Sequence, residues 1–175
     1  YSILIGGIAG FLLIGLPIDG LHVAMFAGLD SFSLLAIPAF ILAGNLMVQG
    51  GVSRAIIDFV NAIMCRVRGS LGAVAVVVSM LFGSITGSSV ATVTAVGGIM
   101  APEMIKQGYE KRYTCALIAA AGFLGILIPP SVPGIMYALM VEEKVTMVWM
   151  STLMPGLVLG VLYIIINYFI YGRKK

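Results

Sequence analysis

The sequence predicts an all-α, polytopic membrane protein that contains a re-entrant hairpin and a discontinuous helix. Hydrophobic residues make up 61% of the 175 residues and charged residues only 10%, with a mean hydropathy of +1.12. A soluble domain carries about a quarter charged residues. This composition excludes a soluble globular domain, a disordered tail and a nucleic-acid-binding module, so we expect a lipid bilayer and no nucleic acid among the partners. Five uncharged runs reach spanning length: 1–18, 31–53, 69–102, 113–141 and 145–172.

The first, second and last runs predict ordinary spans. We expect these spans at 1–18, 31–50 and 146–172, and Pro155-Gly156 can bend the last one. Basic residues collect at alternate ends of the runs, which places nine of the ten Lys and Arg residues on the cytoplasmic side. The chain begins with Tyr1 and shows no signal peptide, so we expect it to begin inside a longer protein.

Residues 53–67 predict an amphipathic arm helix in the cytoplasmic interface. Arg54, Asp58 and Asn61 lie away from the apolar face. An ordinary surface helix packed on other loops fits the same pattern equally well. The apolar face is formed by Ile56, Val60, Ile63 and Val67, with Ile57 and Met64 beside it.

Run 69–102 predicts a re-entrant hairpin. As one helix its 34 residues would reach about 51 Å, well beyond the roughly 30 Å hydrocarbon core. Basic residues stand at both ends of the run, so a single crossing would put one basic cluster outside. A hairpin that enters from the cytoplasm and returns resolves both conflicts, whereas the alternative is one long tilted span.

The apex of this hairpin is predicted at 83–89, which reads GSITGSS. Glycine permits a turn, and Ser and Thr cap helices. We expect a first half-helix over 71–82 and a second that begins near Ser88 or Ser89. A small-residue packing motif between helices is the alternative.

A second break is predicted at 125–134, inside a span over 112–141. This segment reads GILIPPSVPG. Pro129 and Pro130 have no N–H to donate to the carbonyls of Gly125 and Ile126, and Ser131 can cap a new half-helix. A plain proline kink is the alternative.

The two breaks should face each other near the middle of the membrane. Both supply hydroxyls and free carbonyls, which suit a hard cation such as sodium. No charged residue or histidine lies inside the five runs, so helix N-termini and hydroxyls would have to hold an anionic substrate. For that substrate we expect Ser88, Ser89, Thr92 and Ser131.

Several stretches resemble the DctM-like large membrane subunit of tripartite ATP-independent periplasmic (TRAP) transporters. They are LDSFSLLAIPAFILAGNLM at 29–47, GSITGSSVATVTAVGGIMAPEM at 83–104, Gly108-Tyr109, LGILIPPSVPGIMYAL at 124–139 and Pro155-Gly156. The family pattern usually begins the hairpin motif with Ser where this chain has Thr86. It also has a small or polar residue where this chain has Phe123. Only one hairpin and one broken helix are found here, so the chain resembles the first half of such a subunit.

The resemblance implies one repeat of an inverted-repeat, elevator-type permease in the inner membrane of a bacterium. It implies sodium-coupled import of organic anions such as C4-dicarboxylates or sialic acids. A periplasmic binding protein would deliver the substrate, and a small four-helix membrane subunit would be a second partner. Sodium would serve as the coupling ion, and no catalytic residue, cofactor or other metal is expected. The implied cation site maps onto Ser84, Thr86, Gly87, Ser88, Ser89, Gly125, Pro129, Pro130 and Ser131.

Three other functions are alternatives to this one. A divalent-anion sodium symporter would share hairpins of this kind. A non-transporting membrane scaffold would have no need for broken helices. An intramembrane enzyme with Ser88 or Ser89 as nucleophile would need a nearby base, and the only histidine is His22 in an outside loop.

Overall fold

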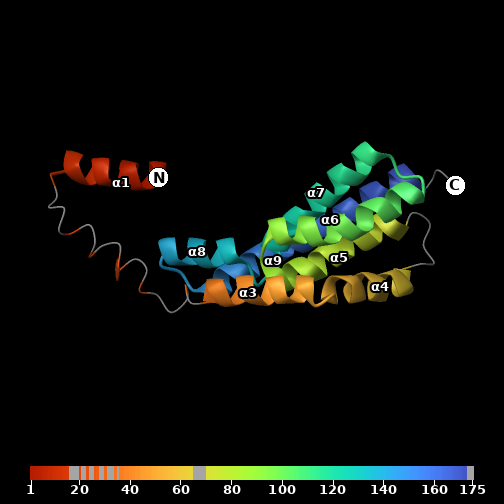
Figure 1. Cartoon of the computed structure of the whole chain (residues 1–175), viewed down its shortest axis with the longest axis horizontal. Helices are drawn as coiled ribbons and strands as arrows, with labels where there is room; N and C mark the ends of the chain where they lie inside the picture. Colours follow the sequence, from red (N-terminus) through yellow and green to blue (C-terminus); the bar gives the residue numbers. More distant parts are fainter. Residues whose placement is uncertain are drawn as a thin grey trace. The chain divides into compact units, whose positions relative to one another are not determined.

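A computed structural model describes residues 1–15, 20, 23, 26–27, 30, 34, 36–64 and 70–172 (Figure 1). Every regular element in this part of the chain is a helix, which confirms the all-α prediction. The chain divides into two compact units, Tyr1–Ala36 and Ile37–Lys175. In the first unit, α1 (Ser2–Leu13) covers most of the predicted span 1–18, and residues 16–18 of that span lie outside the described residues. His22 also lies outside them.

The second unit is a helical bundle built around α5 (Ser70–Thr86). This helix packs against α4 (Val52–Met64), α6 (Ser89–Lys106), α7 (Lys111–Leu127) and α9 (Val145–Asn167). Because neighbours surround it, α5 is apolar on all sides rather than on one stripe. Its fully buried side chains include Val74, Ala75, Val76, Val78 and Phe82.

The helices are apolar enough to form a membrane protein. The α9 helix and its π-helical extension η2 (Tyr168–Gly172) include a candidate span, Val145–Tyr171, of 27 residues with a mean hydropathy of 2.1. Two helix pairs pass the same test only as bent spans. These are α3 (Ala36–Gln49) with α4, bent by 69°, and α7 with α8 (Val132–Met140), bent by 47°. In α9 the predicted weak point, Pro155, lies inside an unbroken helix.

The arm helix α4 buries one flank of its predicted apolar face. It packs on α5 through Ser53, Ile57 and Val60, while Ile63 is 65% exposed. The contact with α5 therefore lies on one flank of the apolar arc, and Phe59 and Ile63 on the other flank remain uncovered. The predicted residue Val67 lies outside the described residues.

The hairpin consists of α5 and α6, which pack on each other and are joined by Gly87 and Ser88. At 17 and 18 residues, each helix reaches about 26 Å, short of the hydrocarbon thickness. The predicted end of the first half-helix near residue 82 is wrong by one turn, because α5 continues to Thr86. Its Ser84 and Thr86 hydroxyls bond back to the carbonyls of Leu81 and Phe82, which is compatible with a continuing helix.

A tyrosine–asparagine cluster closes the base of the hairpin. It consists of Tyr109, Tyr113, Tyr171 and Asn167, packed against Gly72 of α5. The Tyr109 and Tyr171 rings stack at 4.3 Å, and the Tyr113 hydroxyl donates to Asn167 Oδ1 at 3.2 Å. The Tyr109 hydroxyl accepts from the Gly72 amide at 3.4 Å, and burial raises the pKa of this tyrosine. This cluster joins α5, α7, α9 and the loop between α6 and α7.

Candidate functional site

The two chain breaks meet directly. The amide of Val132, at the start of α8, donates to the carbonyl of Gly87 at 3.4 Å. Gly87 has a φ of +60°, and a Cβ placed on it would lie 2.9 Å from the carbonyl oxygen of Pro130. Glycine is therefore required both by the turn and by the close approach. The prediction that the breaks face each other is confirmed by this contact.

A second glycine pair lets α5 and α7 cross at backbone distance. A Cβ on Gly83 would overlap the Cα atom of Gly125. A Cβ on Gly125 would lie 3.1 Å from the Cα of Gly83 and 2.7 Å from Oγ1 of Thr92. Gly125 was predicted in the site, but Gly83 was not. The available signal was spacing, since each glycine stands four residues before the residue that breaks its helix, Gly87 or Pro129.

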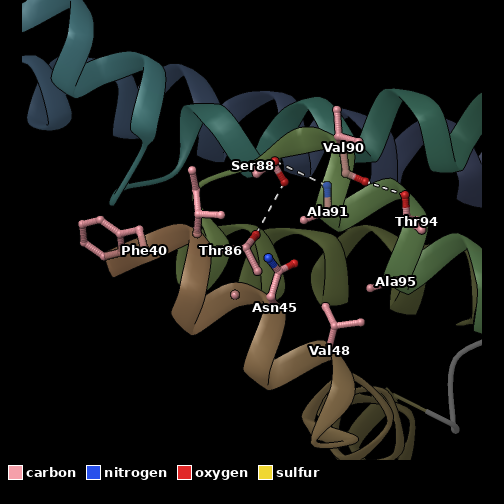
Figure 2. A pocket seen from close by; sticks show the side chains of 11 residues that line it. Phe40, Asn45, Val48, Thr86, Ser88, Val90, Ala91, Thr94 and Ala95 are labelled. Carbon is pink, nitrogen blue, oxygen red and sulfur yellow. Dashed lines mark hydrogen bonds between the residues drawn. The ribbon is translucent and has the colours of Figure 1, made fainter. Parts of the chain in front are cut away.

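A buried hydroxyl cluster lies beside this crossing, formed by Thr86, Thr92 and the carbonyl of Ser88. Oγ1 of Thr92 donates to the Ser88 carbonyl at 2.8 Å, and the two threonine hydroxyls lie 3.4 Å apart. Oγ1 of Thr86 lies 3.2 Å from the Phe82 carbonyl. It also lies 3.5 Å from the Ser88 carbonyl (Figure 2). Each hydroxyl has one hydrogen and a carbonyl to receive it, which leaves oxygen lone pairs able to coordinate a cation.

Two serines cap the half-helices that begin at the breaks. Ser88 Oγ accepts from the Ala91 amide at 3.4 Å at the start of α6. Ser131 Oγ accepts from the Gly134 amide at 3.1 Å at the start of α8, as the sequence predicts. Each serine therefore lies at the beginning of a helix, where the helix dipole is positive, and next to the other chain break.

Four half-helix ends therefore come together. The ends of α5 and α7 contribute backbone carbonyls. In α7, the carbonyls of Gly125 and Ile126 receive no hydrogen bond from Pro129 or Pro130, because proline has no N–H group. The beginnings of α6 and α8 contribute amides. Carbonyl ends favour a cation and amide ends favour an anion, so one site can serve both.

The structure gives two other predicted residues different surroundings. Ser84 donates its hydroxyl hydrogen to the Leu81 carbonyl at 2.7 Å. Ser89 lines a separate cavity of about 340 Å³ with Phe123, between α6 and α7. Within the described part of the chain, neither hydroxyl bonds to the hydroxyl cluster. Phe123, where the family pattern differs, belongs to that second cavity.

The helix α9 supports the second break from outside. Its Trp149 indole N–H donates to the Ser131 carbonyl at 3.4 Å. A Cβ on Gly156 would lie 3.2 Å from Cβ of Leu127 and 3.3 Å from Cγ1 of Ile128, so this glycine lets α9 approach the end of α7. The sequence pattern did not reveal these contacts, because they depend on how distant helices pack.

A cavity of about 330 Å³ lies next to the hydroxyl cluster, between α3 and the hairpin (Figure 2). Thr86 and Ser88 form part of its wall, with Asn45 of α3 and Thr94 of α6 as further polar side chains. Most of its other lining is apolar. The cavity therefore gives the hydroxyl cluster a neighbouring space bounded by a third element, α3.

Comparison with known proteins identifies similar chains. Residues 2–175 match the family model described as the tripartite ATP-independent periplasmic transporter, DctM component. The C4-dicarboxylate TRAP transporter large permease protein of Pseudomonas aeruginosa is 39% identical over 173 residues, covering 97% of this chain and 40% of that protein. The isethionate TRAP transporter permease protein of Oleidesulfovibrio alaskensis is 35% identical over 160 residues, covering 91% of this chain and 25% of that protein.

A third relative is the 2,3-diketo-L-gulonate TRAP transporter large permease protein of Escherichia coli. It is 38% identical over 133 residues, which cover 76% of this chain and 31% of that protein. The chain thus spans well under half the length of each of these curated relatives.

Proposed function

The chain belongs to the DctM component family of tripartite ATP-independent periplasmic transporters, and we propose that it forms part of a sodium-coupled permease that imports organic anions. The members of this family are transport proteins rather than enzymes. The observation that carries this proposal is the contact between the two helix breaks at Gly87 and Val132. It brings cation-favouring and anion-favouring helix ends to one point in a membrane protein.

Sodium would bind at the carbonyl side of this point. Thr86 and Thr92 are almost fully buried and provide neutral oxygen ligands close to the carbonyl of Ser88. Carbonyls at the ends of α5 and α7 would complete the coordination, as at broken helices of other secondary transporters. Oxygen ligands without a fixed charge suit a monovalent cation that must also be released.

The anionic group of the substrate would bind at the amide side. The caps Ser88 and Ser131 mark the beginnings of α6 and α8, where helix dipoles favour negative charge. The named relatives act on C4-dicarboxylates, isethionate and 2,3-diketo-L-gulonate, which are all organic anions. Their shared chemistry supports a carboxylate or sulfonate as the recognised group.

The family supports the remaining assignments. A periplasmic binding protein would deliver the substrate, and a small four-helix membrane subunit would assemble with the permease. The membrane would be the bacterial inner membrane. The basic residues at the end of α6 and the beginning of α7, which are Lys106, Lys111 and Arg112, would lie on its cytoplasmic side.

Uptake by the reconstituted transporter that contains this chain tests the sodium site. Thr92→Val keeps the shape of the side chain but removes the oxygen, so we expect the sodium concentration for half-maximal uptake to rise about tenfold, the effect of losing one good ligand interaction. The measurement is initial uptake against sodium concentration, with choline keeping ionic strength constant. Thr94→Val is the matched control, because the exposed Thr94 hydroxyl bonds the Val90 carbonyl of its own helix.

Ser131→Ala tests the substrate side separately. It removes the cap of α8 without touching the two threonines, so we expect a higher substrate KM and a smaller change in sodium dependence. The sodium-site assignment is wrong if Thr92→Val has the same sodium dependence as the unmodified transporter and as the control Thr94→Val.

A further inference from the structure

The helix α3 contacts the hydroxyl cluster through a glycine. Gly44 is buried, whereas Ile41, Leu42 and Leu46 on the same helix are between 52% and 61% exposed. A Cβ placed on Gly44 would lie 3.3 Å from both Cβ and Cγ2 of Thr86. The backbone of α3 therefore rests directly against this threonine side chain.

This contact falls on the methyl side of Thr86. The hydroxyl side is occupied by the Phe82 carbonyl at 3.2 Å and by Thr92 Oγ1 at 3.4 Å. A helical threonine divides between two χ1 rotamers because its hydroxyl can bond a carbonyl in the preceding turn. A different rotamer would take the hydroxyl away from Thr92.

We propose that Gly44 is a positioning residue for sodium binding. Because the Thr86 methyl group packs against Gly44, α3 favours the rotamer that presents Oγ1 to the hydroxyl cluster. This inference rests on the proposed sodium site, in which Thr86 is a ligand. It adds a third element, outside the two breaks, to the machinery that holds the ion.

The geometry predicts how the contact fails. A methyl group at position 44 is too close to Thr86 by a few tenths of an ångström, so one of the two side chains must move. The Thr86 backbone has little freedom, because the next residue, Gly87, abuts Pro130 and bonds Val132. A change of the Thr86 rotamer would relieve the contact with Cγ2 and would displace Oγ1, whereas the contact with Cβ can be relieved only by a small shift of α3.

A double-mutant cycle in the reconstituted transporter tests this coupling. The variants are Gly44→Ala, Thr86→Ser and the two combined, with Gly98→Ala as the control. Gly98 is also a helical glycine, and a Cβ placed on it has no atom within 4 Å. The readout is the sodium concentration for half-maximal uptake, together with the maximal rate at saturating sodium.

We expect Gly44→Ala to raise the half-saturating sodium concentration about fivefold, within the range of coupling between contacting residues, while Gly98→Ala leaves it unchanged. Thr86→Ser keeps the hydroxyl and removes the methyl, so adding Gly44→Ala to it should change the value by less than about twofold. Recovery of the maximal rate at high sodium would separate weakened binding from general damage. A merely structural role for Gly44 would not depend on the methyl group of Thr86.

Equal effects of Gly44→Ala in both backgrounds, or no effect in the threonine background, would overturn the positioning role. If Thr92→Val alters sodium dependence and Gly44→Ala does not, the sodium site stands and only this inference fails. If neither does, the sodium site itself fails. Should Gly44→Ala not fold, Thr86→Ser alone decides: a twofold or larger rise supports the contact, and an unchanged value contradicts it.

Discussion

The hairpin carries polar groups at both of its ends, and the two ends are built from different chemistry. At the base, the tyrosine–asparagine cluster uses large side chains, with stacked rings and bonds such as Tyr113 to Asn167 at 3.2 Å. At the apex, the hydroxyl cluster uses threonines, a serine carbonyl and glycines. From Gly72 to Thr86 the helix α5 rises about 21 Å, so the two clusters lie far apart along the same helix.

The difference indicates separate roles. The base groups pair with one another and fill their space, which holds four segments together. At the apex, side chains are small, so backbones approach closely and oxygen lone pairs remain for a ligand. We therefore expect substitutions at the base to change stability alone, and substitutions at the hydroxyl cluster to change sodium dependence.

The largest effect is expected at the glycine crossing. Gly83→Ala would force a Cβ into the backbone of Gly125, and neither helix can yield without separating the two breaks. We expect a loss of about 3 kcal/mol of stability and severely reduced uptake, as for strong overpacking. Thermal unfolding of the purified transporter measures the loss, and Gly98→Ala serves as control. If Gly83→Ala were as stable and active as the unmodified protein, the close approach of α5 and α7 at Gly83 and Gly125 would be contradicted.

A smaller loss of stability is expected at the base. Asn167→Leu removes the partner of the Tyr113 hydroxyl and leaves buried polar groups without their bond. We expect a loss of about 2 kcal/mol, the usual penalty for a buried group left unpaired. The sodium concentration for half-maximal uptake should stay within about twofold, because the cluster is remote from the ligands. If Asn167→Leu raised the half-saturating sodium concentration as much as Thr92→Val does, the two clusters would not have separate roles.

The smallest effect is expected from Ser84→Ala. Its hydroxyl bonds the Leu81 carbonyl in its own helix, so its removal should change stability by less than about 0.5 kcal/mol. Sodium dependence should also be unchanged, which a sodium titration of uptake would measure. A marked loss of sodium affinity would show that the apex uses hydroxyls beyond Thr86 and Thr92.

The sequence could predict where the helices break, but not every boundary or contact. Pro129 and Pro130 have no N–H, so the break after α7 follows from covalent structure alone. The end of α5 was misplaced because Ser84 and Thr86 bond back to their own helix, a choice that residue type leaves open.

The supporting contacts lay beyond sequence reasoning for a different reason. Gly44, Gly83 and Trp149 act through neighbours distant in the chain, so their roles depend on how the helices pack. The tyrosine–asparagine cluster was missed in the same way, because Gly72 and Asn167 are 95 residues apart. Residue type gave the chemistry of the hydroxyl cluster, whereas packing gave its geometry.

Equilibrium binding of radioactive sodium to the purified transporter tests the central claim most directly. We expect saturable binding that is lost in part when Thr86→Val and Thr92→Val are combined, while Asn167→Leu binds sodium as the unmodified protein does. Sodium binding that is unchanged in the double threonine variant, or lost in Asn167→Leu, would contradict a cation site at the meeting of the two breaks.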